Sequence, residues 1–423
     1  MINSSTICIA TSLAILTFVV PRKYFLLPYI LAACFVPADQ RIIIMDLDFT
    51  VLRILVVSGF LRILLRGEQL RFKLSHFDKL VLAWAICGAV IYVIQWADMR
   101  ALIYKCGVLF DVIGLYWLFR INIHCWEDIE LVAKTFAVCS LVLAVLVALE
   151  GVTGKNPFVL LGRVTTVVRQ GRYRCQAAFP HSIMLGLFWA TLVPLFIGLG
   201  MTDKKKILYW SAAGASIFII FATASSTPLL ALLLILFLIL LFRYRSYGHL
   251  ITCALCGLTV ALHLVMKAPV WHLIARVNVI GGSTGWHRYL LIDRSIRYFG
   301  EWALVGTRDT AHWGWGLHDL TNQYVLEGVR GGFITLLLFV VLLIMAVKTV
   351  GRYSLRSMPI KQQCLAWCLC VSVLGHCIAF FGVSYFGQIN LLLYMVFAIV
   401  GLVYEISSRP IVRENSPVLV AVT

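Results

Sequence analysis

The chain has 423 residues, of which 61% are hydrophobic and 13% are charged, and its mean hydropathy is +0.93. Soluble globular domains contain about 45–50% apolar and about 25% charged residues, because a soluble chain needs polar residues to cover its surface. This composition therefore excludes a water-soluble protein. The net charge of +17 does not indicate nucleic-acid binding, since the basic residues lie between apolar blocks and not in one polar segment.

Apolar blocks recur along the whole chain, as at 229–242 and 333–347. A membrane-spanning helix needs roughly 17–25 mostly apolar residues, and helices satisfy their own backbone hydrogen bonds in lipid. No segment shows the alternation that membrane β-barrels require. We therefore predict an all-α fold, a polytopic membrane helix bundle of about 12–13 transmembrane helices, thirteen unless one is re-entrant. The predicted spans are 5–20, 24–37, 50–66, 79–96, 101–119, 129–150, 182–200, 206–223, 228–242, 249–266, 332–350, 362–381 and 386–404.

Basic residues are distributed unequally between the two sides of these spans. One set of alternate short loops is rich in Lys and Arg, which the positive-inside rule assigns to the cytoplasm, whereas the opposite short loops contain only Arg41 and Arg100. Two long segments then fall on the external side. The predicted organisation is one membrane domain (1–423), an external loop (151–181), a large structured external, periplasmic loop (267–331) and a flexible cytoplasmic tail (406–423).

Both external loops are rich in arginine. Long loops are exempt from the positive-inside rule, so these arginines need another explanation. The guanidinium group presents a planar fork of donors that matches phosphate oxygens, and several of them at the mouth of a helix bundle would hold a diphosphate without a metal. The alternatives are binding of anionic lipid headgroups or pairing with the carboxylates of the larger loop. The arginines that we assign to diphosphate binding are Arg172, Arg174, Arg288 and Arg294.

The larger external loop has further signs of structure. Residues 286–299 have the spacing of an amphipathic helix, and Trp302, Trp313 and Trp315 predict a position at the membrane interface, where aromatic residues collect. The loop ends in a segment, 314–332, that is dense in polar groups and runs into a span. Polar groups at membrane depth are costly and usually functional.

Within this polar segment, His318 can act as a general base near neutral pH. Asn322 lies one helical turn further on and could hydrogen-bond a sugar or orient the imidazole; Asp319 and Tyr324 complete the candidate saccharide-binding or supporting groups. The alternative for His318 is an interfacial residue bonded to backbone.

The segment 172–182 leads into another predicted span through Pro180, His181 and Ser182, which suit a helix start. A helix N-terminus is itself an anion site, and His181 could support substrate there or serve only in the helix cap. Asp111 and Glu150 stand alone near span ends. The chain has neither the His/Cys spacing of a metal site nor a P-loop, so we predict no metal and no cofactor.

Three short stretches resemble the O-antigen ligase and O-antigen (exopolysaccharide) polymerase superfamily of bacterial inner-membrane glycosyltransferases. Residues 174–182 resemble the family's Arg…Gly-Phe…Pro-Asn stretch, and 286–306 resemble the arginine-bearing helix of its large periplasmic loop. Residues 318–332 resemble its His-Asn-x-Tyr…Glu-x-Gly-x-x-Gly signature, with a longer spacing between His318 and Asn322. The family's Ser-Arg-Gly at a span start is here Ser225-Ser226-Thr227, without the arginine.

The resemblance implies a metal-independent glycosyltransferase that uses an undecaprenyl-diphosphate-linked saccharide at the periplasmic face of the inner membrane. His318 would deprotonate the acceptor hydroxyl, and Arg174 and Arg288 would hold the diphosphate leaving group. The departures from the signature favour a polysaccharide polymerase over an O-antigen ligase that transfers polymer to lipid A–core. The alternatives of other classes are a transporter or flippase of lipid-linked saccharide and a non-catalytic scaffold. The predicted partners are the lipid-linked donor, the saccharide or lipid A–core acceptor, membrane lipid and polysaccharide-assembly proteins, but no nucleic acid.

Overall fold

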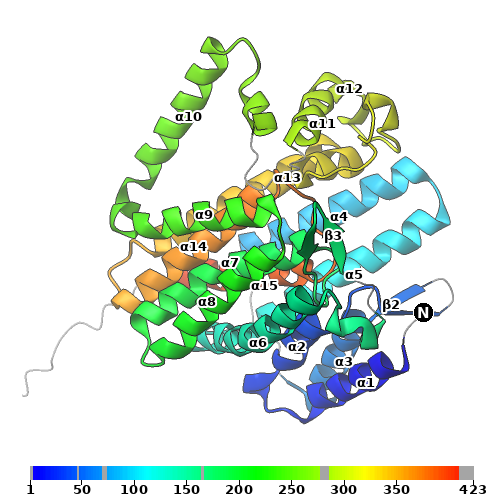
Figure 1. Ribbon diagram of the computed structural model, residues 1–423, viewed down its shortest axis with the longest axis vertical. Coiled ribbons are helices and arrows are strands. Elements are labelled where there is room, and N and C mark those ends of the chain that lie inside the picture. Colours follow the sequence, from blue (N-terminus) through cyan, green and yellow to red (C-terminus); the bar gives the residue numbers. More distant parts are fainter. Residues whose placement is uncertain (1–2, 45–46, 69–73, 163–165, 277–284, 409–423) are drawn as a thin grey trace, which may run out of the picture.

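The computed structural model describes residues 3–44, 47–68, 74–162, 166–276 and 285–408. Over this part of the chain nearly all regular structure is helical, and the helices form a bundle (Figure 1). The protein is therefore an all-α membrane helix bundle, as its composition predicts. The α-helices are α1 (Ser4–Val19), α2 (Leu27–Phe35), α3 (Val51–Arg66), α4 (His76–Trp96), α5 (Met99–Asn122), α6 (Trp126–Thr153), α7 (Ser182–Thr202), α8 (Lys206–Ala222), α9 (Ser226–Leu240), α10 (Gly248–Val265), α11 (Gly285–Arg297), α12 (Phe299–Trp302), α13 (Gln323–Tyr353), α14 (Ile360–Ala379) and α15 (Ile389–Ser408).

Short elements fill the connections between these helices. Two antiparallel hairpins lie in loops, β1 (Arg41–Ile44) with β2 (Leu47–Thr50), and β3 (Val167–Arg169) with β4 (Arg172–Arg174). The chain also turns through short 3-10 helices, namely η1 (Arg22–Tyr24), η2 (Pro157–Leu161), η3 (Leu241–Tyr247), η4 (Val270–Arg276) and η5 (Ala311–Trp313).

The helices bear on the predicted number of spans. Each of the thirteen predicted spans coincides with helix, and eight helical stretches among the described residues are long and apolar enough to cross a membrane alone, with α9 and α10 counted as one stretch. Helix α2 has only nine residues, which at about 1.5 Å per residue covers less than half of a bilayer core roughly 30 Å thick. It does not cross as a helix, and this favours the twelve-span alternative.

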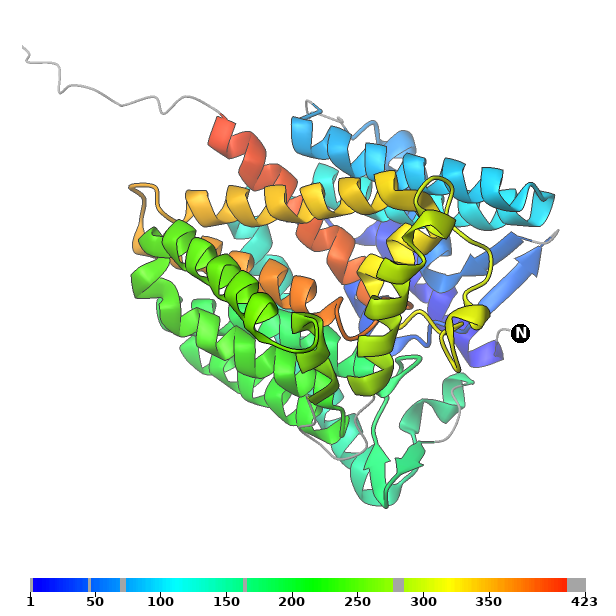
Figure 2. The same ribbon diagram turned by 90° about the horizontal axis from the view of Figure 1, so that it is seen from above.

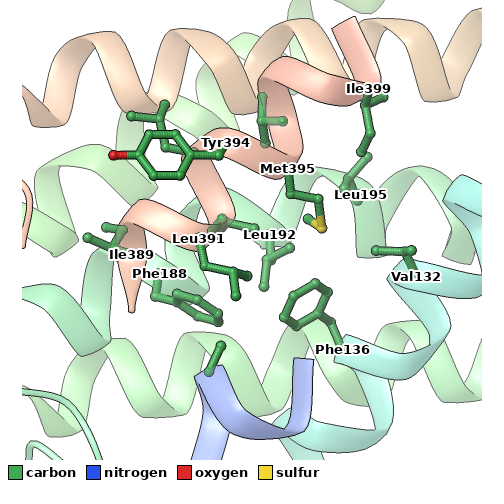
Figure 3. Packing of buried hydrophobic residues seen from close by; sticks show 14 of the residues in the cluster. Val132, Phe136, Phe188, Leu192, Leu195, Ile389, Leu391, Tyr394, Met395 and Ile399 are labelled. Atoms are coloured by element: carbon green, nitrogen blue, oxygen red, sulfur yellow. The ribbon is translucent and has the colours of Figure 1, made fainter. Parts of the chain in front are cut away.

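The centre of the bundle is packed around α7, whose residues are buried almost without interruption from Met184 to Gly200. Side chains of α6, α7 and α15 interdigitate there (Figure 3), and the rings of Phe136 and Phe188 meet edge to face with centroids 5.8 Å apart. Inside a bilayer the hydrophobic effect does not drive helices together, because their apolar surfaces are not in contact with water. Close van der Waals packing of this kind holds them together instead. Helix α7 is therefore firmly held in the bundle, and it anchors the end of the segment that precedes it, residues 174–181.

The larger loop has a small apolar core of its own. The predicted amphipathic helix is confirmed as α11, and Leu291 on it is buried together with Trp302, Trp313 and Leu317. Helices α11 and α12 lie beside the start of α13 (Figure 2). Trp302 and Trp313 fill this core, whereas Trp315 is 98% exposed, so the interfacial position expected from the three tryptophans stays a prediction that only Trp315 is free to serve with its side chain.

A break at Gly332 divides α13 and lets the larger loop dock against it. Gly332 has φ 70° and ψ 174°, outside the helical region. The N–H of Phe333 donates to the carbonyl of Ala303 at 2.8 Å, and that of Thr307 donates to the carbonyl of Val329 at 2.8 Å. The half-helix 323–331, which ends the predicted polar segment, is thereby joined to the loop.

Gly332→Ala is expected to destabilise the protein by about 1–3 kcal/mol, the cost of a side chain in such a backbone conformation. An added Cβ would also lie 2.5 Å from the carbonyl oxygen of Leu304. The midpoint of thermal unfolding in detergent measures the effect. Gly257→Ala in α10, where an added Cβ meets nothing within 4 Å, is the matched control. Equal midpoints for the two variants would contradict the prediction.

Arg120, in the last turn of α5, is buried inside the bundle. Its Nε lies 3.1 Å from Asp78 Oδ1 and its Nη2 lies 2.6 Å from Glu405 Oε2, which ties together α4, α5 and α15. The charge of Arg120 is therefore neutralised inside the bundle. The predicted tail beyond residue 408 lies outside the described residues.

Candidate functional site

The segment from Arg174 to His181 crosses the end of the bundle between β4 and α7, and Glu150 at the end of α6 holds it. Glu150 Oε1 accepts the N–H of Gln176 at 3.0 Å and the hydroxyl of Thr166 at 2.8 Å, and Oε2 accepts the N–H of Ala177 at 2.9 Å. The side chain is fully buried, a position that a carboxylate tolerates only when it is hydrogen-bonded. Glu150 is therefore not the isolated carboxylate that the sequence suggests but a clamp on this segment.

Glu150→Gln is expected to loosen the segment at a cost of about 1–3 kcal/mol, the penalty for an unsatisfied buried group. The amide of glutamine would place an N–H donor against the N–H of Gln176, the N–H of Ala177 or the hydroxyl of Thr166, each of which donates to Glu150. Limited proteolysis within residues 154–181 measures the loosening, and cleavage at the wild-type rate would contradict the proposed clamp. Glu130→Gln at the other end of α6, where Glu130 pairs with Lys361 on a partly exposed surface, is the matched control.

Arg174, the first residue of this segment, reaches the start of α9. It is 8% exposed, and its Nη2 donates to Ser225 Oγ at 2.7 Å. Ser225 Oγ in turn donates to the carbonyl of Thr223 at 2.9 Å and lies 3.3 Å from Ser182 Oγ. The Nε of Arg174 is buried without a hydrogen-bond partner in the described part of the chain, so this guanidinium retains an unused donor.

Arg288, on α11 of the larger loop, reaches the same place from the other side. Its Nη2 donates to Thr227 Oγ1 at 2.9 Å, and its Nε donates to the carbonyl of Gly382 at 3.0 Å. The two arginines, more than one hundred residues apart in the chain, therefore converge on residues 225–227. We call Arg174, Ser225, Thr227 and Arg288 the anion site.

The charge of this cluster is uncompensated. Neither guanidinium has a carboxylate within ion-pair distance among the described residues, and every hydrogen bond they make there goes to a neutral oxygen. Burial lowers the pKa of both groups, and the charge of Arg169 lowers that of Arg174 further. This is the direction expected for a cation removed from water without a counter-ion. A bound anion would supply that counter-ion.

Helix α9 adds to the same preference for an anion. It has fifteen residues, and its N-cap Ser225 makes no side-chain capping bond, because its hydroxyl serves Arg174 and Thr223 instead. A helix N-terminus carries partial positive charge and unsatisfied N–H donors. The helix end and the two guanidiniums therefore reinforce each other, and a phosphate group has the matching charge and geometry.

An apolar groove adjoins the anion site. It has a volume of about 740 Å³ and runs between the ends of α6 and α8 and the start of α9. Its wall includes Cys175 and Ala224, the chain neighbours of Arg174 and Ser225, together with Val147, Phe218 and Phe221. A ligand with an anionic head and an apolar tail would fit this arrangement.

His318 lies in the turn that precedes α13 and is exposed. The turn packs against α11, because His287 Nε2 lies 3.3 Å from the carbonyl oxygen of Asp319 and a Cβ on Gly316 would lie 3.8 Å from the ring of His287. His287 precedes Arg288 in the chain. The fold therefore packs the turn that carries His318 and Asp319, both exposed, against α11, the helix that also carries Arg288.

Three other polar residues of this segment, Asn322, Tyr324 and Glu327, are engaged within the protein. Asn322 is the N-cap of α13, and its Oδ1 accepts the N–H of Val325 at 3.1 Å. The hydroxyl of Tyr324 donates to the carbonyl of Cys377 at 2.9 Å. Glu327 accepts hydrogen bonds from the indole of Trp84 and the amide of Gln323. We predicted that Asn322 and Tyr324 bind saccharide or support the site. In the structure both side chains make hydrogen bonds within the protein.

The remaining predicted residues lie outside the anion site. Arg172 is exposed near the tip of the β3–β4 hairpin, and Arg294 is six residues after Arg288 on α11, about 240° around the helix. His181 caps α7, since its Nδ1 accepts the N–H of Ile183 at 3.0 Å. The geometry therefore joins two of the four predicted arginines.

Sequence reasoning missed the segment 380–388 between α14 and α15. Gln323 holds this segment through two hydrogen bonds. Its backbone N–H donates to the carbonyl of Phe380 at 2.9 Å, and its Oε1 accepts the N–H of Tyr385 at 2.8 Å. The same segment supplies the Gly382 carbonyl that orients Arg288. No motif marks this segment, because what it contributes to the anion site is a backbone carbonyl.

Fold and site together define a multi-pass α-helical membrane protein with a cationic site at one end of its bundle. Comparison with protein-family models and with curated proteins found no match for the chain.

Proposed function

We propose that this protein is a membrane glycosyltransferase that joins an undecaprenyl-diphosphate-linked saccharide to an acceptor hydroxyl at the periplasmic face of the bacterial inner membrane. The convergence of Arg174 and Arg288 on the start of α9, without a carboxylate partner in the described chain, carries this proposal. One buried guanidinium (Arg174) and one partly buried guanidinium (Arg288) beside an apolar groove fit a lipid-linked diphosphate better than a soluble anion.

In the proposed reaction, the bond between the anomeric carbon and the diphosphate oxygen breaks as the acceptor hydroxyl attacks that carbon. Negative charge develops on the diphosphate, and pre-placed guanidiniums stabilise the charge more in the transition state than in the ground state. His318, exposed in the turn that packs against α11, takes the proton of the acceptor hydroxyl. The lipid tail lies in the groove between α6, α8 and α9.

The product class within this reaction is polysaccharide, formed by polymerisation of lipid-linked repeats. The runner-up is ligation of finished polymer to lipid A–core. The lipid-linked intermediates that accumulate in a deletion strain separate the two, because loss of a polymerase leaves single repeats on the lipid and loss of a ligase leaves long polymer there.

Binding of undecaprenyl diphosphate to the purified protein in nanodiscs tests the donor site directly. We expect saturable binding that undecaprenol, which has the same tail and no phosphate, does not compete. Equal competition by undecaprenol would contradict the diphosphate assignment. Movement of lipid-linked saccharide across vesicles without formation of a new glycosidic bond would favour the flippase alternative.

A further inference from the structure

A second cavity differs from the groove in chemical character. It has a volume of about 240 Å³ and lies between α2, α3, α5 and the start of α15. Its polar lining consists of Thr50, Asp111, Gln388, Asn390 and Tyr394. Small-molecule pockets are usually about 300–1,000 Å³, so this one suits a single ring and not a long chain.

Gln388 connects the wall of this cavity to the segment that carries Arg174. Its Nε2 donates to the carbonyl of Ala178 at 2.8 Å and to that of Val36 at 3.0 Å. On Gly387, an added Cβ would lie 2.8 Å from the ring of Pro180. Residues 174–181 therefore have Arg174 of the anion site at one end and border the cavity further along.

The cavity has no net charge. Asp111, which the sequence presents as an isolated carboxylate, is paired with Arg53 through two hydrogen bonds, Nε to Oδ1 at 2.8 Å and Nη2 to Oδ2 at 2.7 Å. Each carboxylate oxygen keeps a further lone pair. An ionic ligand would find no opposite charge here, whereas a neutral ligand with hydroxyl groups would find acceptors.

Further polar groups of the lining are available to a ligand. Gln388 is 1% exposed, and its Oε1 has no hydrogen-bond partner in the described part of the chain. Tyr394 lines the cavity together with Asp111, and its hydroxyl points away from Met395 in the core (Figure 3). An acceptor oxygen without a partner and a phenol beside a carboxylate are groups that bind sugar hydroxyls.

We propose that this neutral cavity binds one uncharged sugar ring, and that in the transfer reaction this ring belongs to the acceptor saccharide. The binding stands on the cavity alone, whereas its role as acceptor site rests on the proposed function. Because the cavity has no net charge, it would hold the acceptor without competing for the diphosphate.

Saturation-transfer NMR on the full-length protein in nanodiscs tests this assignment. The probes are the methyl glycosides of glucose, galactose, mannose and N-acetylglucosamine at millimolar concentration. We expect transfer to at least one of them, unchanged when inorganic pyrophosphate is added. Absence of transfer to all four glycosides, or displacement by pyrophosphate, would overturn the inference.

Two variants locate the bound glycoside. Asn390→Ala removes a polar group from the lining and is expected to weaken binding about tenfold, the effect of roughly one hydrogen bond. Ala38→Leu keeps every polar group and fills space at the wall that Ala38 lines. Asn122→Ala at the far end of α5 is the matched control and should bind as the wild type does. Wild-type binding by both cavity variants would overturn the assignment.

The same samples separate this inference from the proposed function. Binding of pyrophosphate without any glycoside would overturn the cavity assignment and leave the diphosphate chemistry supported. Glycoside binding that Asn390→Ala weakens, without pyrophosphate binding, would support the cavity and contradict the proposed donor site. In a transfer assay, Asn390→Ala should raise KM for the acceptor and leave KM for the lipid donor unchanged, which a loss of folded protein would not do.

Discussion

Arg288→Ala is expected to lower the rate of saccharide transfer by about 10²–10³-fold, the effect of removing one pre-placed donor from a developing negative charge. Arg174→Ala should have an effect of similar size, because both guanidiniums converge on the start of α9. The initial rate in proteoliposomes, with a lipid-diphosphate-linked saccharide as donor, measures both effects. The loss should lie mainly in kcat, since charge on the diphosphate grows as the glycosidic bond breaks.

The control for these variants lies on the same helix as Arg288. Arg297→Lys changes a mostly exposed arginine while keeping a cation for its partner Asp293, which is buried and lies 2.8 Å away. It should leave transfer unchanged. Wild-type transfer by both Arg174→Ala and Arg288→Ala would contradict the anion site.

Lysine at either position gives a second comparison. Arg288→Lys keeps the charge but loses the planar fork that serves Thr227 and Gly382 together. Partial recovery relative to alanine would indicate that charge dominates. No recovery would indicate that the fork geometry dominates, and either result is compatible with diphosphate binding.

The fold follows from the sequence to a large extent, because a bilayer leaves the backbone few choices. Every predicted span is helical, and the amphipathic segment of the larger loop is α11. Composition alone could not predict how long each helix is or at which residue it ends. Residues 24–37 have the hydropathy of a span, but the structure folds them as a three-residue 3-10 helix and the nine residues of α2.

The candidate site follows from the sequence only in part. Arg174 and Arg288 were identifiable because external arginines lack a topological reason. Their meeting point was not: the resemblance marks Ser225-Ser226-Thr227 as the place of the family's Ser-Arg-Gly, but nothing in the sequence shows that Arg174 and Arg288 converge there. Glu150 and Asp111 read as isolated carboxylates, since their partners are backbone N–H groups in one case and Arg53, 58 residues away in the chain, in the other. Pairing over such separations is a property of the folded chain.

His318→Ala is expected to lower transfer by about 10²–10⁴-fold, the usual contribution of a general base, and so to abolish detectable polymer. The residue is exposed in a turn held by Thr310, whose hydroxyl donates to the carbonyl of Leu317 at 2.7 Å, and by the contact between His287 and Asp319. Its own side chain holds no structural contact in the described chain, so the variant should insert and unfold as the wild type does. Polymer formation in a deletion strain and the initial rate with purified donor measure the effect.

The matched control for the base is His312→Ala. His312 is exposed in the same loop, 2.9 Å from Glu301 Oε2, and its replacement should leave transfer unchanged.

His287→Ala should have an intermediate effect, because it frees the turn without removing the imidazole of His318. Binding of the lipid diphosphate should survive His318→Ala and fail in the arginine variants, since one group acts on the acceptor and the others on the donor. Full transfer by His318→Ala would assign the base to another residue of this loop surface, and Asp319, exposed beside His318, would be the next to replace.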